Sequence, residues 1–117
     1  MSRTPRRSGR QIGDRFVPRR PLRLGRDAPA KMAARSISAA EVHAILTDNV
    51  IVQVIDHRAR FVLLGVVAAR PLIAVVADDE ISDATVLISV YEPDQDHGWT
   101  PEAIRAILEG DRREEGP

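Results

Sequence analysis

Four apolar runs follow one another between residues 50 and 91, and they restrict the possible fold more than any other feature. The runs are Val50–Asp56, Arg60–Ala68, Leu72–Asp78 and Thr85–Tyr91. They are rich in β-branched residues, which favour strands, and short polar breaks separate them. None of the breaks is long enough for a helical crossover, so neighbouring strands should pair antiparallel. The pattern predicts a four-stranded antiparallel meander sheet.

Three of these runs are apolar on both faces of the expected sheet. In the second run, Phe61 and Leu63 would point to one side, and Val62 and Leu64 to the other. An antiparallel sheet with a solvated face would show polar alternation instead. We therefore expect both faces to be covered. A helix at 39–47 can cover one face, and the other requires a C-terminal helix, a second subunit or a partner protein.

Two helices are expected before the sheet. Asp27 can cap a short helix that runs to about Arg35, with a proline in its first turn. Ser38 and Glu41 have the spacing of a capping box, which predicts a second helix at 39–47. This second helix carries an apolar stripe at i, i+3 and i+4 positions, and the stripe is expected to pack on the sheet.

A third helix is expected after the sheet. Thr100 suits its N-cap position, and Pro101 suits its first turn. Gly110 is placed to end it, and residues 111–117 are expected to be disordered. With two N-terminal helices, the meander sheet and this C-terminal helix, the chain is predicted to form one α+β domain over 27–110.

The charge of the chain is divided between a basic arm and an acidic body. Residues 1–26 hold nine arginines and one aspartate, whereas 27–117 hold eight Lys or Arg and sixteen Asp or Glu. We interpret 1–26 as a disordered tail, because its apolar residues show no sustained period and cannot offset chain entropy. Arginines such as Arg19 and Arg20 could bind phosphate backbones. Alternatively, the arm could fold back on the acidic body of its own or a neighbouring chain.

Several classes of protein and site are excluded. The chain has no cysteine, which rules out disulfides and thiolate zinc sites and fits a reducing cytoplasm. No apolar run reaches the ~18 residues of a membrane span. No Gly-rich phosphate loop, nucleophile elbow or two-histidine zinc motif is present. Asp94, Asp96 and His97 include metal-ligand types, but nothing distant completes a coordination shell, so we expect neither a metal nor another cofactor.

Short motifs spread over residues 27–99 carry a resemblance. They are Met32, Ile37-Ser38, Glu41-Val42, Leu63-Leu64-Gly65, Arg70-Pro71-Leu72 and Tyr91-Glu92-Pro93-Asp94 with Trp99. Together they resemble a bacterial domain of unknown function, DUF family four-two-five-eight, which is similar in architecture to the RelE/ParE-like toxins. The resemblance implies the toxin of a toxin–antitoxin pair; several such toxins are ribonucleases that act on messenger RNA, and others poison gyrase. It also implies an antitoxin protein that wraps the sheet.

A first candidate site lies where the last strand ends. In a meander, the hairpin at Arg70 falls at the same end of the sheet as Tyr91 and Glu92. A metal-independent ribonuclease needs a general base, a general acid and a cation for the phosphate, and Glu92, Tyr91 and Arg70 could fill these roles. The structural alternative is that Arg70 pairs with Glu92 or Asp94 and fixes the corner, while Tyr91 and Trp99 pack.

A second candidate site lies at the opposite end of the sheet. His57, Arg58 and Arg60 are close in sequence there, and across the sheet they should face Asp78, Asp79 and Glu80. A histidine that titrates near neutrality beside two cations suits RNA cleavage, with Arg58 and Arg60 binding the RNA. The alternative is an exposed turn histidine among solvated charges.

The resemblance is compatible with proteins that have no catalytic activity. This chain has Asp27 and Ile73 at two positions where members of the family often carry histidine. Any chemistry that those histidines perform elsewhere in the family cannot take place here. The first hypothesis is a metal-independent ribonuclease toxin with RNA as its substrate. The alternatives are a non-catalytic protein-interaction module of the same fold, and a nucleic-acid-binding accessory protein that uses the basic arm.

Overall fold

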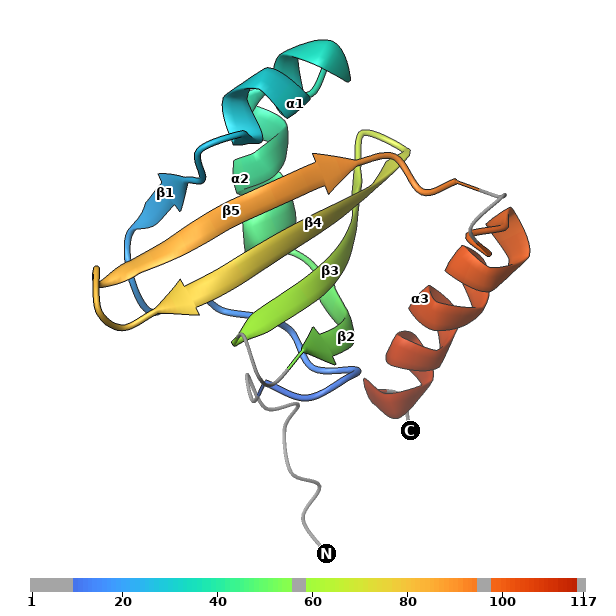
Figure 1. Ribbon diagram of the computed structural model, residues 1–117. Helices are drawn as coiled ribbons and strands as arrows, with labels where there is room; N and C mark the ends of the chain where they lie inside the picture. The colour runs from blue at the N-terminus through green and yellow to red at the C-terminus, as the bar shows by residue number, and fades with distance from the viewer. Residues whose placement is uncertain (1–9, 56–58, 95–97, 116–117) are drawn as a thin grey trace, which may run out of the picture.

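The computed structural model describes residues 10–55, 59–94 and 98–115, with side chains as far as Leu108. Within these ranges the chain forms a five-stranded sheet and three helices (Figure 1). The elements are β1 Leu22–Leu24, α1 Ala28–Ala34, α2 Ala39–Thr47, β2 Val50–Ile55, β3 Arg60–Val67, β4 Arg70–Asp79, β5 Ala84–Tyr91 and α3 Pro101–Glu115. None of the described helices is long and apolar enough to cross a membrane.

The sheet has the strand order β1-β5-β4-β3-β2. Strands β2, β3, β4 and β5 pair antiparallel with one another in chain order, so the predicted meander is confirmed. The prediction of a four-stranded, wholly antiparallel sheet is nevertheless wrong, because β1 pairs parallel with β5, Leu22 opposite Thr85 and Leu24 opposite Leu87. A three-residue strand is too short to show a period in sequence, and it forms only where an edge is available to it.

The hairpin between β3 and β4 is as short as a hairpin can be. Val67 pairs with Arg70, so only Ala68 and Ala69 form the loop. Both have positive φ angles, 52° and 68°, as a type I′ turn requires. Alanine is unfavourable in this region, so the turn stores strain that the pairing of long apolar strands on either side overcomes.

The N-terminal segment is part of the folded domain from residue 10 onward. Phe16 is fully buried in the core, and the Asn49 side chain makes hydrogen bonds with both the N–H and the carbonyl group of Phe16. Asn49 Oδ1 accepts from the Phe16 N–H at 2.9 Å, and its Nδ2 donates to the Phe16 carbonyl at 3.1 Å. Gly13 and Asp14 also exchange 2.8 Å backbone hydrogen bonds with Ile51 on β2. The prediction of a disordered tail is therefore wrong for residues 10–26, and the rest of it lies outside the described residues.

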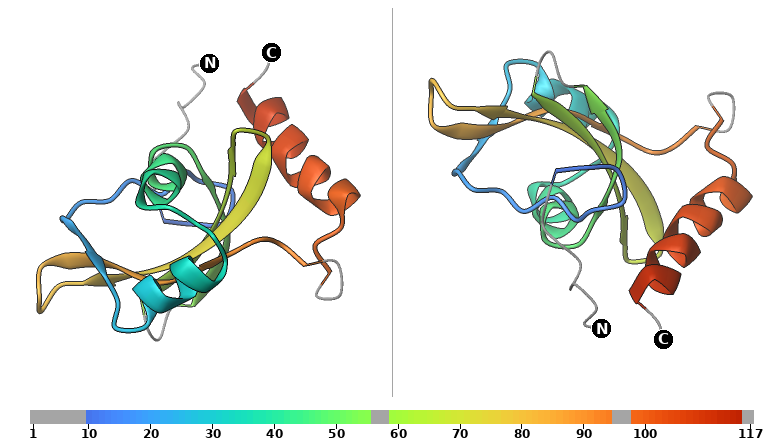
Figure 2. Two further views of the ribbon diagram at one scale, coloured as in Figure 1. Left: turned by 90° about the horizontal axis from the view of Figure 1, so that it is seen from above. Right: turned by 90° about the horizontal axis from the view of Figure 1, so that it is seen from below.

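One face of the sheet carries α1 and α2 (Figures 1 and 2). The capping box of α2 is confirmed: Ser38 Oγ accepts from the Glu41 N–H, and a Glu41 carboxylate oxygen accepts from the Ser38 N–H. The Asp27 side chain, in contrast, makes no capping hydrogen bond to the described residues of α1. Gly65 lets α2 approach β3, because a Cβ there would lie 3.1 Å from the Asp48 carbonyl oxygen. The buried cluster on this face is Phe16, Ala28, Met32, Ile37, Val42, Ile45, Leu46, Ile51, Phe61, Leu63, Leu72, Ala74, Val76, Leu87 and Val90.

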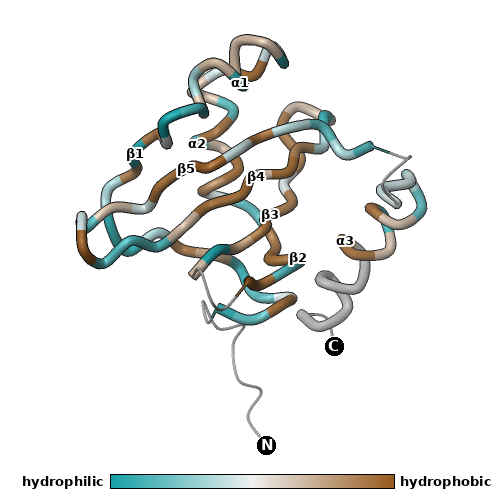
Figure 3. The backbone as a smooth tube through the Cα atoms, in the orientation of Figure 1, coloured by the Kyte–Doolittle hydropathy of each residue, from teal (hydrophilic) through white to brown (hydrophobic). Residues whose placement is uncertain are grey.

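The other face carries α3, on the opposite side of the sheet from α2 (Figure 2). Its buried centre is small, and most of the surrounding apolar side chains remain partly exposed. The buried residues are Val50, Val62, Leu64 and Ile73, and those packed around them are Val52, Val75, Tyr91, Trp99, Ile104, Ile107 and Leu108. Figure 3 shows the hydrophobic positions concentrated on the central strands, with further ones along α3. The second face is therefore covered by the chain itself, but incompletely.

Helix α3 begins as predicted and ends later than predicted. Thr100 Oγ1 accepts from the Ala103 N–H at 3.0 Å, as an N-cap residue does. The helix continues through Gly110 to Glu115, so the expected stop at Gly110 is wrong, whereas the expected disorder of the C-terminal tail stays a prediction. A glycine inside a helix costs only about 1 kcal/mol, and the charged residues that follow are tolerant of helix. The described helices and strands thus extend from Leu22 to Glu115, beyond both ends of the predicted domain at 27–110.

Candidate functional site

The Arg70 side chain joins three segments at one corner of the sheet. Its Nη2 donates to Glu92 Oε1 at 2.8 Å, which confirms that the β3–β4 hairpin lies beside the exit of β5. Its Nη1 donates to Glu41 Oε2 at 3.0 Å. The same guanidinium also donates to the carbonyl oxygens of Ser36 and Arg35 in the link between α1 and α2. Arg70 therefore connects that link, α2 and β5.

The electrostatics of this corner favour a structural role for Arg70. The hydrogen bond with Glu92 raises the pKa of Arg70, and the charge of Glu41 acts in the same direction. The Ser38 backbone N–H lowers the pKa of Glu41, and Arg70 contributes to that lowering. One guanidinium thus faces two carboxylates, so the trio carries a net negative charge. An incoming phosphate would have to compete with both carboxylates for the same donors.

Glu41 is the residue that sequence reasoning missed at this corner. The sequence predicts only a capping-box role for it, yet it uses one carboxylate oxygen for the Ser38 N–H and the other for Arg70. No local signal in the sequence reports this contact, because Glu41 and Arg70 are 29 residues apart and meet only in the fold.

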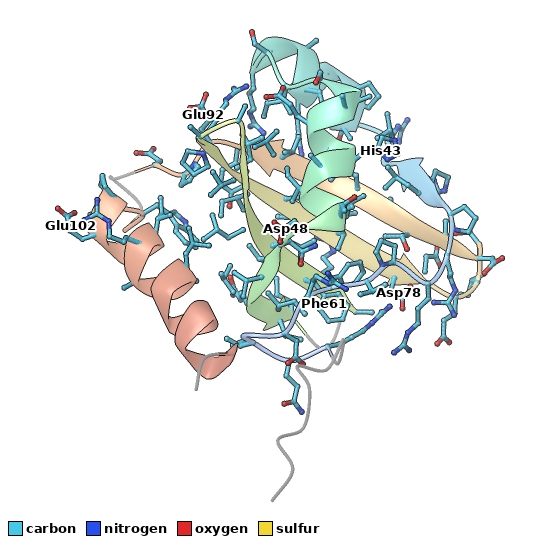
Figure 4. The ribbon with its side chains drawn as sticks, turned by 180° about the vertical axis from the view of Figure 1, so that it is seen from behind. His43, Asp48, Phe61, Asp78, Glu92 and Glu102 are labelled. Carbon is cyan, nitrogen blue, oxygen red and sulfur yellow. The ribbon has the colours of Figure 1, made fainter. Side chains whose placement is uncertain are left out.

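Tyr91 does not join Arg70 and Glu92. Consecutive strand residues point to opposite faces, and Tyr91 pairs with Ile73 on the face covered by α3. Burial there raises the pKa of Tyr91, and the positive charge of Arg35, whose guanidinium lies 5.9 Å from the ring centre, partly offsets the effect. The predicted trio of base, acid and cation is therefore reduced to Arg70 and Glu92. Figure 4 shows Glu92 at this corner, away from the labelled Asp78 at the other end of the sheet.

The second candidate site can be followed only in part. His57 and Arg58 lie outside the described residues. Arg60 opens β3, opposite Ala77 on β4. Asp78, one of the acidic residues predicted to face this group, binds Arg10 and Arg20.

Asp78 holds the described part of the basic arm against the sheet. Its Oδ2 accepts from Arg10, and its Oδ1 accepts from Arg20 at 2.7 Å. The Arg10 guanidinium lies over the rings of Phe16 and Phe61, 4.7 Å and 5.5 Å from their centres. Burial alone would raise the pKa of Asp78, but the hydrogen bonds and charges of the two arginines outweigh it and lower the pKa. Figure 4 shows Phe61 and Asp78 in the same region of the molecule.

Other arm residues make similar contacts with the acidic body. Arg20 also lies 3.2 Å from Asp83 and 3.8 Å from Glu80, and Arg23 lies 3.8 Å from Asp79. Of the two arm arginines proposed to bind nucleic acid, Arg20 is thus paired with carboxylates of its own chain. Arg19, the other, is exposed. In the described part of the arm, folding back on the acidic body is the alternative that is realised.

An apolar groove lies between α3 and the β3–β4 hairpin, and sequence reasoning did not find it. It encloses about 430 Å³ and is lined by Val66, Ala69, Pro71, Pro101, Ile104, Arg105 and Leu108. Val66 is 46% exposed, which is unusual for a valine inside a central strand. A smaller cavity of about 180 Å³ adjoins it, because both share Val66 and Leu108. The groove depends on where α3 docks, and no local sequence signal reports that position.

Among the residues that the structure describes, no group of three or more His, Cys, Asp or Glu side chains could hold a metal ion. Asp96 and His97 lie outside this part of the chain. No protein-family model, no curated protein and no solved structure matches the chain. The resemblance to the bacterial domain of unknown function therefore stays a prediction.

Proposed function

We propose that this protein is a non-catalytic protein-interaction module, and that its binding site is the groove between α3 and the β3–β4 hairpin. The observation that carries the proposal is the lining of the groove, which is aliphatic except for Arg105. Its volume of about 430 Å³ lies within the range of ordinary ligand sites, roughly 300–1,000 Å³.

The lining indicates the chemistry of the partner. The walls contact a ligand through methyl and ring carbons, so the partner should present a branched aliphatic side chain. Arg105 is exposed at the groove, and it favours a carboxylate next to that side chain. The groove offers no aromatic platform on which a nucleotide base could stack. A protein segment with an aliphatic residue between acidic ones fits best.

The contacts of the Arg70 corner also support this proposal. Arg70 makes two ion pairs and two further hydrogen bonds to carbonyl oxygens, and Tyr91 packs on the other face. A corner built in this way stabilises the hairpin that forms one wall of the groove. In this proposal, residues predicted to be catalytic hold the binding surface in shape.

Methyl NMR spectra can test the groove directly. We expect an acetylated, amidated Glu-Ile-Glu peptide to shift the methyl signals of Val66, Ile104 and Leu108 at millimolar concentration. The matched Lys-Ile-Lys peptide should bind more weakly, and the Arg105→Glu variant should reverse the order. Equal shifts from both peptides, or shifts confined to Ile12 far from the groove in sequence, would contradict the proposal.

A metal-independent ribonuclease toxin is the second candidate, and the pair of Arg70 and Glu92 is the observation that favours it. Glu92 is 59% exposed while it contacts Arg70, so a carboxylate and a cation are accessible together. RNA would be its substrate and an antitoxin its partner, and a cysteine-free chain of this kind suits the cytoplasm. Growth arrest with RNA cleavage by the wild type, abolished by Glu92→Gln at unchanged folding, would favour the toxin over the module. Intact RNA and normal growth would dismiss it.

A nucleic-acid-binding accessory protein is not proposed. Its basis was the free basic arm, and Arg10, Arg20 and Arg23 pair with acidic residues of the same chain.

A further inference from the structure

The tip of the β4–β5 hairpin exposes a hydrophobic side chain. Ile81 is 99% exposed, more than any other large hydrophobic residue that the structure describes. The turn around it is held by Asp79, which accepts hydrogen bonds from the Ile81 and Ser82 N–H groups and from the Ser82 hydroxyl. These bonds with Ser82 lower the pKa of Asp79, so the turn keeps its anchor at neutral pH. Ile81 is therefore presented on an ordered turn.

The flanks of Ile81 are acidic. Glu80 and Asp83 have side chains that are 82% and 80% exposed. Arg20 lies 3.8 Å and 3.2 Å from these carboxylates, yet their exposure leaves them open to a second cation. An aliphatic side chain between two carboxylates is the kind of ligand that the groove should accept.

The tip and the groove cannot meet within one molecule. Pro71, in the groove wall, stands near the start of β4, and the turn follows its last residue, Asp79. A strand rises about 3.3 Å per residue, so the ten-residue β4 separates the two sites by roughly 30 Å. Figure 1 shows the β4–β5 hairpin and the β3–β4 hairpin at opposite ends of the sheet. Only another molecule can bring an Ile81 turn to the groove.

We propose that the Ile81 turn of one copy docks in the groove of a second copy, with Glu80 and Asp83 beside Arg105. This inference rests on the proposed function of the groove. The contact joins two different surfaces, so each complex keeps a free turn at one end and a free groove at the other. Copies should therefore associate head to tail, into open chains or closed rings. One aliphatic side chain and exposed ion pairs form a weak contact, which salt weakens further.

Sedimentation velocity at rising concentration, up to the millimolar range, tests the contact. The wild-type mass should increase with concentration, whereas Ile81→Asp and Val66→Glu should each remain monomeric. Arg105→Glu provides a second groove variant on an exposed helix position, should Val66→Glu fail to fold. Ile12→Asp, which changes an exposed hydrophobic residue elsewhere, should behave like the wild type.

Mixing the variants gives the sharpest result. Ile81→Asp keeps an intact groove, and the groove variant keeps an intact turn, so an equimolar mixture should form a one-to-one dimer and stop there. A mixture that remains monomeric while the wild type associates would overturn the inference, as would association that survives Ile81→Asp. A wild-type chain that stays monomeric would also overturn it. If the Glu-Ile-Glu peptide still shifts the groove methyls in that case, the proposed function stands.

Discussion

Replacing Phe16 with alanine tests the claim that the N-terminal segment belongs to the core. The ring is fully buried, its centre lies 5.1 Å from that of Phe61, and the Arg10 guanidinium covers it. Removing a buried phenylalanine costs about 3–5 kcal/mol, because transfer free energy is lost and a cavity remains. We expect the free energy of unfolding to fall by about 4 kcal/mol, a large share of the roughly 5–15 kcal/mol typical of a domain.

Urea denaturation followed by far-ultraviolet circular dichroism measures this loss. Fluorescence is less suitable, because Trp99, the only tryptophan, packs beside α3 and reports on that helix first. Val17→Ala is the matched control, since Val17 is the next residue and is 36% exposed. Its effect should stay within about 0.5 kcal/mol. A loss below about 1 kcal/mol for Phe16→Ala would refute the reasoning, because it lies far below the roughly 3–5 kcal/mol typical of a buried phenylalanine.

Four further predictions concern the sheet, its charges and α3. Ala69→Gly should raise the unfolding free energy in urea by about 1 kcal/mol, because glycine tolerates the positive φ of this turn; a loss would contradict that φ. Arg70→Ala should lower the melting temperature more than Arg19→Ala does, since Arg70 joins three segments; equal effects would contradict a stabilising role for Arg70. The pKa of Asp78 is lower in the folded chain, so its stabilising effect is complete above the ordinary carboxyl pKa and is lost as pH falls through the folded value. Asp78→Asn should therefore flatten the loss of stability in urea titrations between neutral and acidic pH, and an unchanged pH profile would argue against it. Gly110→Ala should increase helicity by circular dichroism, as expected inside a helix; a decrease would restore Gly110 as the C-terminal stop.

The protein-interaction hypothesis gives the Arg70 corner a role in stabilising the binding groove. The contacts of Arg70 and the two-residue turn hold the β3–β4 hairpin in place. That hairpin contributes Ala69 and Pro71 to the lining of the groove. Arg70→Ala should therefore weaken binding of the acidic peptide, although Arg70 does not line the groove. The ribonuclease hypothesis predicts instead that the same change abolishes cleavage while the groove still binds.

Local patterns determined much of the fold. The four strands, their antiparallel order and the capping box of α2 depend on residues close in sequence, and these predictions hold. The meander also brought Arg70 and Glu92 together, because hairpin connectivity alone places these two positions at one end of the sheet. Strand alternation could further have shown that Tyr91 and Glu92 point to opposite faces.

The sequence by itself thus determined the four strands of the meander and the positions at which the three helices begin, since propensity and capping act over a few residues. Only the tertiary structure decided where the flanking segments go. Residues 10–26 dock because Asn49, Asp78 and the edge of β5 lie far away in sequence but provide the right partners in space. The position of α3, and with it the groove, likewise follows from which apolar patch of the sheet the other helices leave open. Such contacts have no periodic signature, because each depends on the folded shape of the rest of the chain.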